Sequence, residues 1–184
     1  MSKVYAFMAN GLEEIECLAV VDILRRAGIE CETVSITAER EVTGSHGIRV
    51  IADRCWEEIA IGEDDVLFLP GGMPGTKYLG GFAPLCDVLK KHAAVGGRMA
   101  AICAAPSVLG DLGLLVGKKA TCYPGFEERL LGAVYVSDGV VTDGNVTTAR
   151  GMGFAIDLGL ELVKLLSGEE QARNLKAAIQ HNAL

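Results

Sequence analysis

The chain has 184 residues, of which 50% are hydrophobic and 5% aromatic, and its formal net charge is −7. This length fits one domain, residues 1–184, and abundant glycine with few aromatic residues favours α/β packing over a β-sandwich. The negative charge supports solubility and argues against a broad basic surface for nucleic acid or anionic membranes.

The sequence shows neither a targeting pattern nor a metal-binding cysteine pattern. The N-terminal apolar run is too short for a signal peptide, and no apolar stretch reaches the ~18 to 20 residues of a membrane helix. The cysteines form no CxxC pair and stand at positions 17, 31, 55, 86, 103 and 122. We expect a cytoplasmic protein with reduced thiols and with neither a metal nor a cofactor.

Apolar runs suited to buried parallel strands alternate along the chain with stretches of helical period. The main strands are predicted at residues 3–9, 32–36, 66–69, 99–103 and 146–148, with lesser strands at 49–52 and 135–137. The main helices are predicted at residues 13–27, 84–94, 106–112, 154–166 and 169–181. This alternation predicts an α/β fold with a doubly wound, mostly parallel sheet.

Sites in such a sheet form outside the carboxyl ends of the strands, so the loops that follow strands are the candidates. Three loops stand out, at residues 10–16, 69–75 and 101–106. The first carries three glutamates, the second a Gly-Gly pair and the third a cysteine.

Cys103 lies between an apolar strand and a predicted helix, with alanine at the flanking positions where a nucleophile elbow needs small side chains. Backbone N–H groups at the start of that helix would favour a thiolate and lower the thiol pKa. The alternative is that Cys103 is a small buried hydrophobic residue, the commonest role of a free cysteine.

Two backbone groups and one carboxyl group could assist Cys103. The N–H groups of Gly72 and Ala104 could form an oxyanion hole, although the Gly-Gly pair also fits a plain tight turn. Glu16 could be a buried carboxyl that stays protonated near a thiolate and donates a proton. Acids are also favoured at helix starts without any catalytic role.

The three histidines are poorly placed to act as the base of a cysteine hydrolase. His92 is expected on a surface helix, His181 lies near the C-terminus, and His46 is expected to be a solvated loop residue. A triad within one chain is therefore not predicted.

Several motifs together resemble one known family: Gly11-x-Glu13-Glu14-x-Glu16, Arg25-Arg26-Ala27-Gly28-Ile29, Leu69-Pro70-Gly71-Gly72, Ala100-Ala101-Ile102-Cys103-Ala104-Ala105-Pro106 and Arg150-Gly151-x-Gly153. They are similar to motifs of the ThiJ/PfpI superfamily, and within it to the DJ-one (Parkinson disease protein 7) branch. The resemblance covers nearly the whole chain.

This resemblance implies a flavodoxin-like sandwich, similar in class to the class I glutamine amidotransferases, and a homodimer. It implies Cys103 as nucleophile, Glu16 as its protonated hydrogen-bond partner, and Gly72 and Ala104 as backbone donors. Tyr123 stands where relatives place a histidine or an aromatic residue beside the thiol, so we expect it to shape the pocket or to donate a hydrogen bond.

The chain departs from the family's peptidase and amidotransferase branches, which place a histidine directly after the nucleophile or later in a triad. Ala104 occupies the next position here, which argues against both activities. Arg26 matches a family arginine, whereas His46 stands where some members carry an arginine near the dimer interface.

The function implied is a cysteine-dependent, glutathione-independent glyoxalase or deglycase that acts on methylglyoxal-type 2-oxoaldehydes or on their early adducts. An alternative is a redox-responsive stress or chaperone protein that uses oxidation of Cys103. A third, lesser alternative is a cysteine hydrolase whose histidine, His46, comes from the partner chain.

Overall fold

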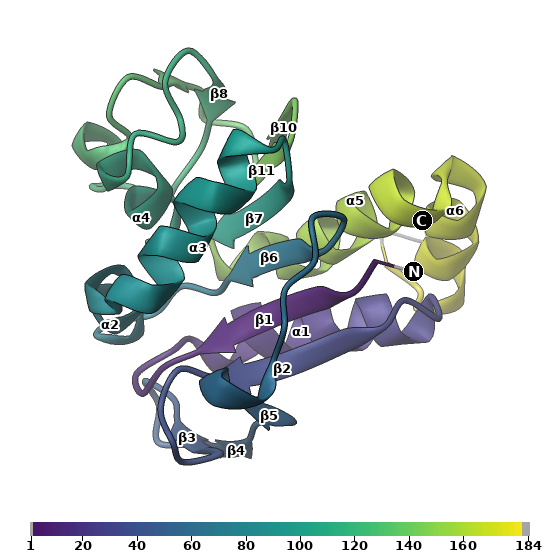
Figure 1. Ribbon diagram of the computed structural model, residues 1–184. Helices are drawn as coiled ribbons and strands as arrows, with labels where there is room; N and C mark the ends of the chain where they lie inside the picture. Colours follow the sequence, from purple (N-terminus) through teal and green to yellow (C-terminus); the bar gives the residue numbers. More distant parts are fainter. Residues whose placement is uncertain (1, 182–184) are drawn as a thin grey trace.

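The computed structural model describes residues 2–181, and its centre is a mostly parallel sheet. The strands of this sheet are β1 (Val4–Met8), β2 (Cys31–Ser35), β5 (Arg54–Cys55), β6 (Val66–Leu69), β7 (Arg98–Ile102), β10 (Val140–Asp143) and β11 (Val146–Ala149). Within the described residues the sheet has seven strands in the order β10-β11-β7-β6-β1-β2-β5 (Figure 1). Only the edge strand β10 runs antiparallel to its neighbour.

Helices cover both faces of the sheet (Figure 1). One face packs against α1 (Glu14–Arg26), α5 (Ala155–Ser167) and α6 (Glu169–Ala178). The other face packs against α2 (Gly75–Gly81), α3 (Ala83–Ala94) and α4 (Pro106–Asp111). The result is a three-layer α/β/α sandwich.

Strand β1 shows why the central strands read as continuous apolar runs. Val4, Ala6 and Met8 belong to the core on the α1 side, whereas Tyr5 and Phe7 belong to the core on the α3 side. Successive side chains of a strand point to opposite faces, and both faces are buried here.

Short elements lie outside the main sheet. Strands β3 (Glu41–Thr43) and β4 (Arg49–Ile51) form an antiparallel hairpin, and β8 (Lys119–Ala120) pairs with β9 (Val134–Tyr135). Single 3₁₀ turns are η1 (Trp56–Glu58), η2 (Glu127–Arg129) and η3 (Met152–Phe154). No helix within residues 2–181 is long and apolar enough to cross a bilayer.

The predicted fold class is confirmed, and each predicted main strand and helix exists with ends shifted by a few residues. The largest shift is in the last helix, which was predicted to reach residue 181 but ends at Ala178. Helix α2 and the strands β3, β5, β8 and β10 were not predicted. Three of the seven residues of α2 are glycine, the poorest helix former after proline, so its sequence carries little helix signal.

Candidate active site

Cys103 occupies a sharp turn between β7 and α4, as its sequence context predicted. Its φ angle is 63°, in the left-handed region that non-glycine residues rarely adopt and that costs about 1–2 kcal/mol. Two hydrogen bonds hold this turn: the Cys103 N–H donates to the Ala149 carbonyl at 2.9 Å, and the Cys103 carbonyl accepts from the Tyr123 N–H at 2.8 Å. Strain held in this way is typical of functional sites.

Cys103 also differs from the other cysteines in accessibility. It is half-buried, whereas the other five cysteines of the chain are buried and free. A small molecule therefore has access to the Cys103 thiol first.

Glu16 approaches this thiol from the first turn of α1. The residue is only 1% exposed, and its carboxyl group is hydrogen-bonded to Cys103. Its Oε2 also accepts a hydrogen bond of 3.0 Å from the Gly71 N–H. The structure thus brings together the predicted thiol and the predicted carboxyl.

Burial raises the pKa of Glu16 to about 7, and the negative charge of Glu13 acts in the same direction. Hydrogen bonds from Cys103 and from the Gly71 N–H lower the pKa but do not outweigh burial. A carboxyl with this pKa holds a proton in a large fraction of molecules at neutral pH, which fits the predicted protonated state.

The predicted lowering of the Cys103 thiol pKa is wrong as a net effect. Burial raises the pKa of Cys103 to about 12, helped by the negative charge of ionised Glu16 and the hydrogen bond to it. The N–H groups of Ala104 and Gly72 lower the pKa, as expected of an oxyanion hole, but by less. Because the two acids interact, the thiolate forms readily only when Glu16 carries the proton.

Two glycines make the approach of Glu16 to Cys103 possible. A Cβ at Gly71 would lie 2.4 Å from the Glu16 Oε2 and 2.6 Å from the Cys103 Cβ. Gly72 has φ +91°, and a Cβ there would lie 2.1 Å from the Glu13 nitrogen. Gly71 was missed as a site residue, although the Gly-Gly pair after a strand was the signal for it.

Tyr123 lies at the rim of the site. Its backbone N–H holds the Cys103 carbonyl, its side chain is about half exposed, and its ring lies 3.3 Å from where a Cβ at Gly151 would stand. The structure places the Tyr123 backbone against the turn that carries Cys103, while the role of its side chain stays a prediction.

None of the histidines hydrogen-bonds Cys103 within the described residues. His92 is 5% exposed rather than on the surface, and its Nε2 is 3.0 Å from the Asp65 carbonyl oxygen. The His46 side chain is 69% exposed, as expected of a loop residue, but its Nδ1 lies 2.9 Å from the Glu14 Oε2. His181 lies 2.9 Å from an Asp157 oxygen.

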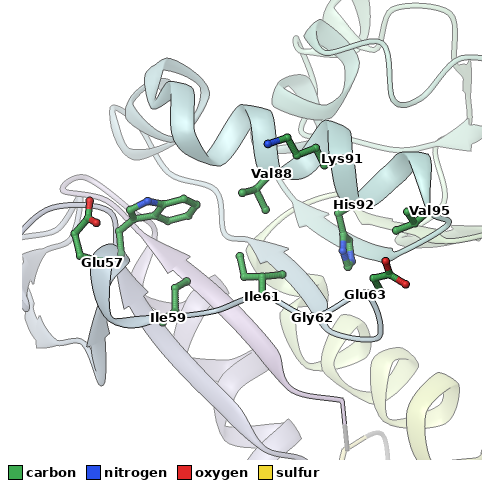
Figure 2. Close-up of a pocket in the computed structure, with 10 residues that line it drawn as sticks. Glu57, Ile59, Ile61, Gly62, Glu63, Val88, Lys91, His92 and Val95 are labelled. Atoms are coloured by element: carbon green, nitrogen blue, oxygen red, sulfur yellow. The ribbon is translucent and has the colours of Figure 1, made fainter.

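A separate cavity of about 400 Å³ lies between α3 and residues 56–63. Figure 2 shows Val88 and His92 of α3 facing Ile61 and Gly62 of the opposite segment. None of the predicted site residues lines this cavity. It is therefore distinct from the Cys103 site.

Residues 2–165 match the DJ-1/PfpI family. "Protein DJ-1 homolog B" of Arabidopsis thaliana is 40% identical over 172 residues, which are 92% of this chain and 39% of that protein. The chain therefore spans well under half of the length of this plant relative. "Glutathione-independent glyoxalase DJR-1.2" of Caenorhabditis elegans is 31% identical over 165 residues, covering 89% of this chain and 87% of that protein.

Among solved structures, one described as "Toxoplasma gondii DJ-1, oxidized" superposes with a TM-score of 0.92. Its sequence is 34% identical, and the alignment covers 98% of each chain. The order of strands and helices described above is therefore that of a known fold.

Proposed function

This chain belongs to the DJ-1/PfpI family, and we propose that it is a cysteine-dependent, glutathione-independent glyoxalase for small 2-oxoaldehydes such as methylglyoxal. The observation that carries the proposal is the contact between the half-buried Cys103 and the buried Glu16. The name of the Caenorhabditis elegans relative adds support for this reaction class.

In the first step the Cys103 thiol loses its proton to water while Glu16 is protonated, and the thiolate attacks the aldehyde carbon and forms a C–S bond. The aldehyde oxygen gains the electron pair of the carbonyl and takes a proton from Glu16, which gives a hemithioacetal. The N–H groups of Gly72 and Ala104 point to the thiol and stabilise the negative charge that develops on this oxygen.

In the second step the hemithioacetal isomerises to a thioester. Ionised Glu16 removes the C1 hydrogen as a proton and returns a proton to C2, while the C1 hydroxyl proton passes to the C2 oxygen. C1 is thereby oxidised and C2 reduced without an external oxidant. Water then hydrolyses the thioester to lactate and restores the thiol. One carboxyl group that exchanges its proton near neutral pH suits both directions of transfer.

Early adducts of 2-oxoaldehydes with amines or thiols contain the same aldehyde-derived carbon. The proposal extends to their cleavage, the deglycase reaction. The C–S bond to Cys103 would form as the bond between the adduct carbon and the amine or thiol breaks, and Glu16 would give its proton to the leaving group, which yields the same hemithioacetal. Comparing free methylglyoxal with a preformed adduct under single-turnover conditions separates the two substrates.

The test is lactate formation from methylglyoxal by freshly reduced protein without glutathione. We expect Cys103→Ala to have no activity above background and Glu16→Gln to lose about 10²- to 10⁴-fold in kcat, the contribution of general acid–base catalysis. Cys86→Ala, which changes a cysteine of α3 outside the site, should retain activity. Absence of lactate with the unaltered protein would refute the proposal.

A second candidate function is redox sensing by Cys103. The accessibility of this cysteine favours it, and so does the similarity to a Toxoplasma gondii protein whose solved structure is described as oxidized. Hydrogen peroxide would oxidise the thiolate to sulfenic acid with release of hydroxide, and a second peroxide would give sulfinic acid with release of water. Addition of two oxygen atoms at Cys103 under mild peroxide, with no aldehyde turnover, would favour this function.

We also propose that the protein is a homodimer. Exposed apolar side chains on one side of α1, Ile15 and Leu18, lie near the loop that carries exposed Ile48. Light scattering of the purified chain tests this proposal, since a monomeric mass at micromolar concentration would contradict it.

A further inference from the structure

A second cluster of chemistry-bearing side chains lies one turn away from the Cys103 site. Glu13 is the N-cap of α1 and Glu14 its first residue, and both face His46 in the turn of the β3–β4 hairpin. One oxygen of each glutamate and the His46 ring nitrogen lie within 4.8 Å of one another. Two chain segments therefore bring two carboxylates and one imidazole together.

The charges of this cluster are not balanced by Lys or Arg. Glu13 and Glu14 are 9% and 3% exposed, and within residues 2–181 their only ion-pair partner is His46. Buried carboxylates are normally paired with a cation or coordinate a metal. The start of α1 contributes a partial charge of only about +0.5, which does not offset two carboxylates.

Both Glu14 oxygens accept hydrogen bonds from residues 45 and 46, whereas Glu13 keeps one oxygen free. The Glu13 Oε2 accepts the Glu16 N–H at 2.7 Å, but its Oε1 accepts no hydrogen bond among the described residues and lies 3.9 Å from the His46 Nδ1. The Glu13 side chain is 12% exposed, so this free oxygen next to an imidazole nitrogen is open to a ligand from solvent.

We propose that Glu13, Glu14 and His46 bind a divalent first-row transition ion, for which Zn²⁺ is the natural probe. Ligands at about 2.1 Å from Zn²⁺ in tetrahedral directions stand about 3.4 Å apart. The His46 Nδ1 is 2.9 Å from the Glu14 Oε2 and 3.9 Å from the Glu13 Oε1, so one separation is shorter and the other longer than this value. Small side-chain adjustments would complete the site.

The donor set selects the class of metal. An imidazole ligand favours Zn²⁺ and its neighbours over Mg²⁺ and Ca²⁺, which prefer oxygen ligands. In the single chain the His46 side chain is 69% exposed, which leaves room at the ion for water as a further ligand.

The test is calorimetric titration of Zn²⁺ into the full chain carrying Cys103→Ser, which removes the accessible thiol as a competing ligand. We expect one Zn²⁺ per chain. Adding His46→Arg preserves a positive partner for Glu14 but removes the nitrogen ligand. It should weaken Zn²⁺ binding by at least about tenfold, because losing a residue that only hydrogen-bonds a metal ligand already costs about that much affinity.

His181→Ala in the same Cys103→Ser background is the matched control, because His181 also lies 2.9 Å from a carboxylate oxygen but belongs to no three-residue cluster among the described residues. Its Zn²⁺ affinity should stay within about twofold. Bound Co²⁺ should give d–d absorption without a thiolate charge-transfer band.

Three results would overturn the proposal: no Zn²⁺ binding by Cys103→Ser, equal affinity with and without His46→Arg, or a thiolate band with Co²⁺. Thermal unfolding of each variant without metal checks that the comparison is made between folded proteins. His46→Arg is chosen over changes to Glu14 because it leaves the buried carboxylates in place.

Discussion

The Glu16 carboxyl group reaches the Cys103 thiol across the α-carbon of Gly71. The Gly71 N–H holds the Glu16 Oε2 at 3.0 Å, and the space where a side chain at Gly71 would lie is bordered by both the Glu16 Oε2 and the Cys103 Cβ. Three segments far apart in the sequence, the start of α1 and the ends of β6 and β7, therefore meet at one contact.

Gly71→Ala should separate Glu16 from Cys103. Its Cβ would lie 2.4 Å from the Glu16 Oε2, so the carboxyl or the turn must move. We expect an overpacking loss of about 1–3 kcal/mol in the free energy of unfolding, with kcat reduced nearly as far as in Glu16→Gln. Denaturant unfolding and lactate formation measure the two effects.

Gly81→Ala is the matched control for Gly71→Ala. A Cβ at Gly81 in α2 meets nothing within 4 Å, and alanine is the better helix former. Its activity should be unchanged and its stability equal or slightly higher. Full activity in Gly71→Ala would show that the close contact across Gly71 is not needed for turnover.

The pKa of Glu16 predicts how stability depends on pH. Burial raises this pKa from 4.5 to about 7 in the folded chain, so between these values the folded state keeps a proton that the unfolded state has released. The contribution of Glu16 to stability is therefore present below about pH 4.5 and is lost as the pH rises to about 7. Its total is about 3 kcal/mol, since each pH unit between these two pKa values is worth about 1.4 kcal/mol.

Glu16→Gln removes this titration. The variant should have the higher free energy of unfolding. Its advantage over the unaltered chain should grow between about pH 5 and 7 and be constant above about pH 8. Urea unfolding at several pH values measures the difference. A difference that is independent of pH would mean that Glu16 is ionised throughout this range.

The sequence predicts the fold well because the central strands are buried on both faces and their apolar runs need no partner to be recognised. The burial of His92 was also predictable from the sequence, because Leu85, Leu89 and His92 recur at helical spacing and form the buried stripe of α3. That spacing predicts a buried His92, whereas residue type alone suggests the surface.

The candidate site was predictable only in part, since its chemistry depends on distances between segments. Cys103 carries a local signal in its small neighbours, which any elbow requires. The raised thiol pKa does not follow from local sequence, because it depends on burial and on Glu16, which reaches Cys103 only in the folded chain. The same holds for His46, whose partner Glu14 lies in another element.

Tyr123 separates two possible roles at the rim of the site. Its hydroxyl group makes no hydrogen bond among the described residues, while its ring lies against Gly151. If the ring shapes the pocket, Tyr123→Phe should keep kcat/KM within about twofold, whereas Tyr123→Ala should lower it by about tenfold, chiefly through KM. A large loss in Tyr123→Phe would instead assign the hydroxyl group a hydrogen bond to the substrate.

The positive φ of Cys103 predicts that the turn which holds the thiol lowers the stability of the folded chain. A side chain at φ 63° costs about 1–2 kcal/mol that glycine does not incur. Because Cys103→Ala keeps this strain and Cys103→Gly relieves it, the glycine variant should be more stable than the alanine variant by about 1 kcal/mol, after allowance for the greater freedom of glycine in the unfolded chain. Both variants lack the thiol and should form no lactate. Thermal and urea unfolding of the two variants measure this difference. If the alanine variant is the more stable of the two, the turn is not strained, and its geometry is no longer evidence of a functional site.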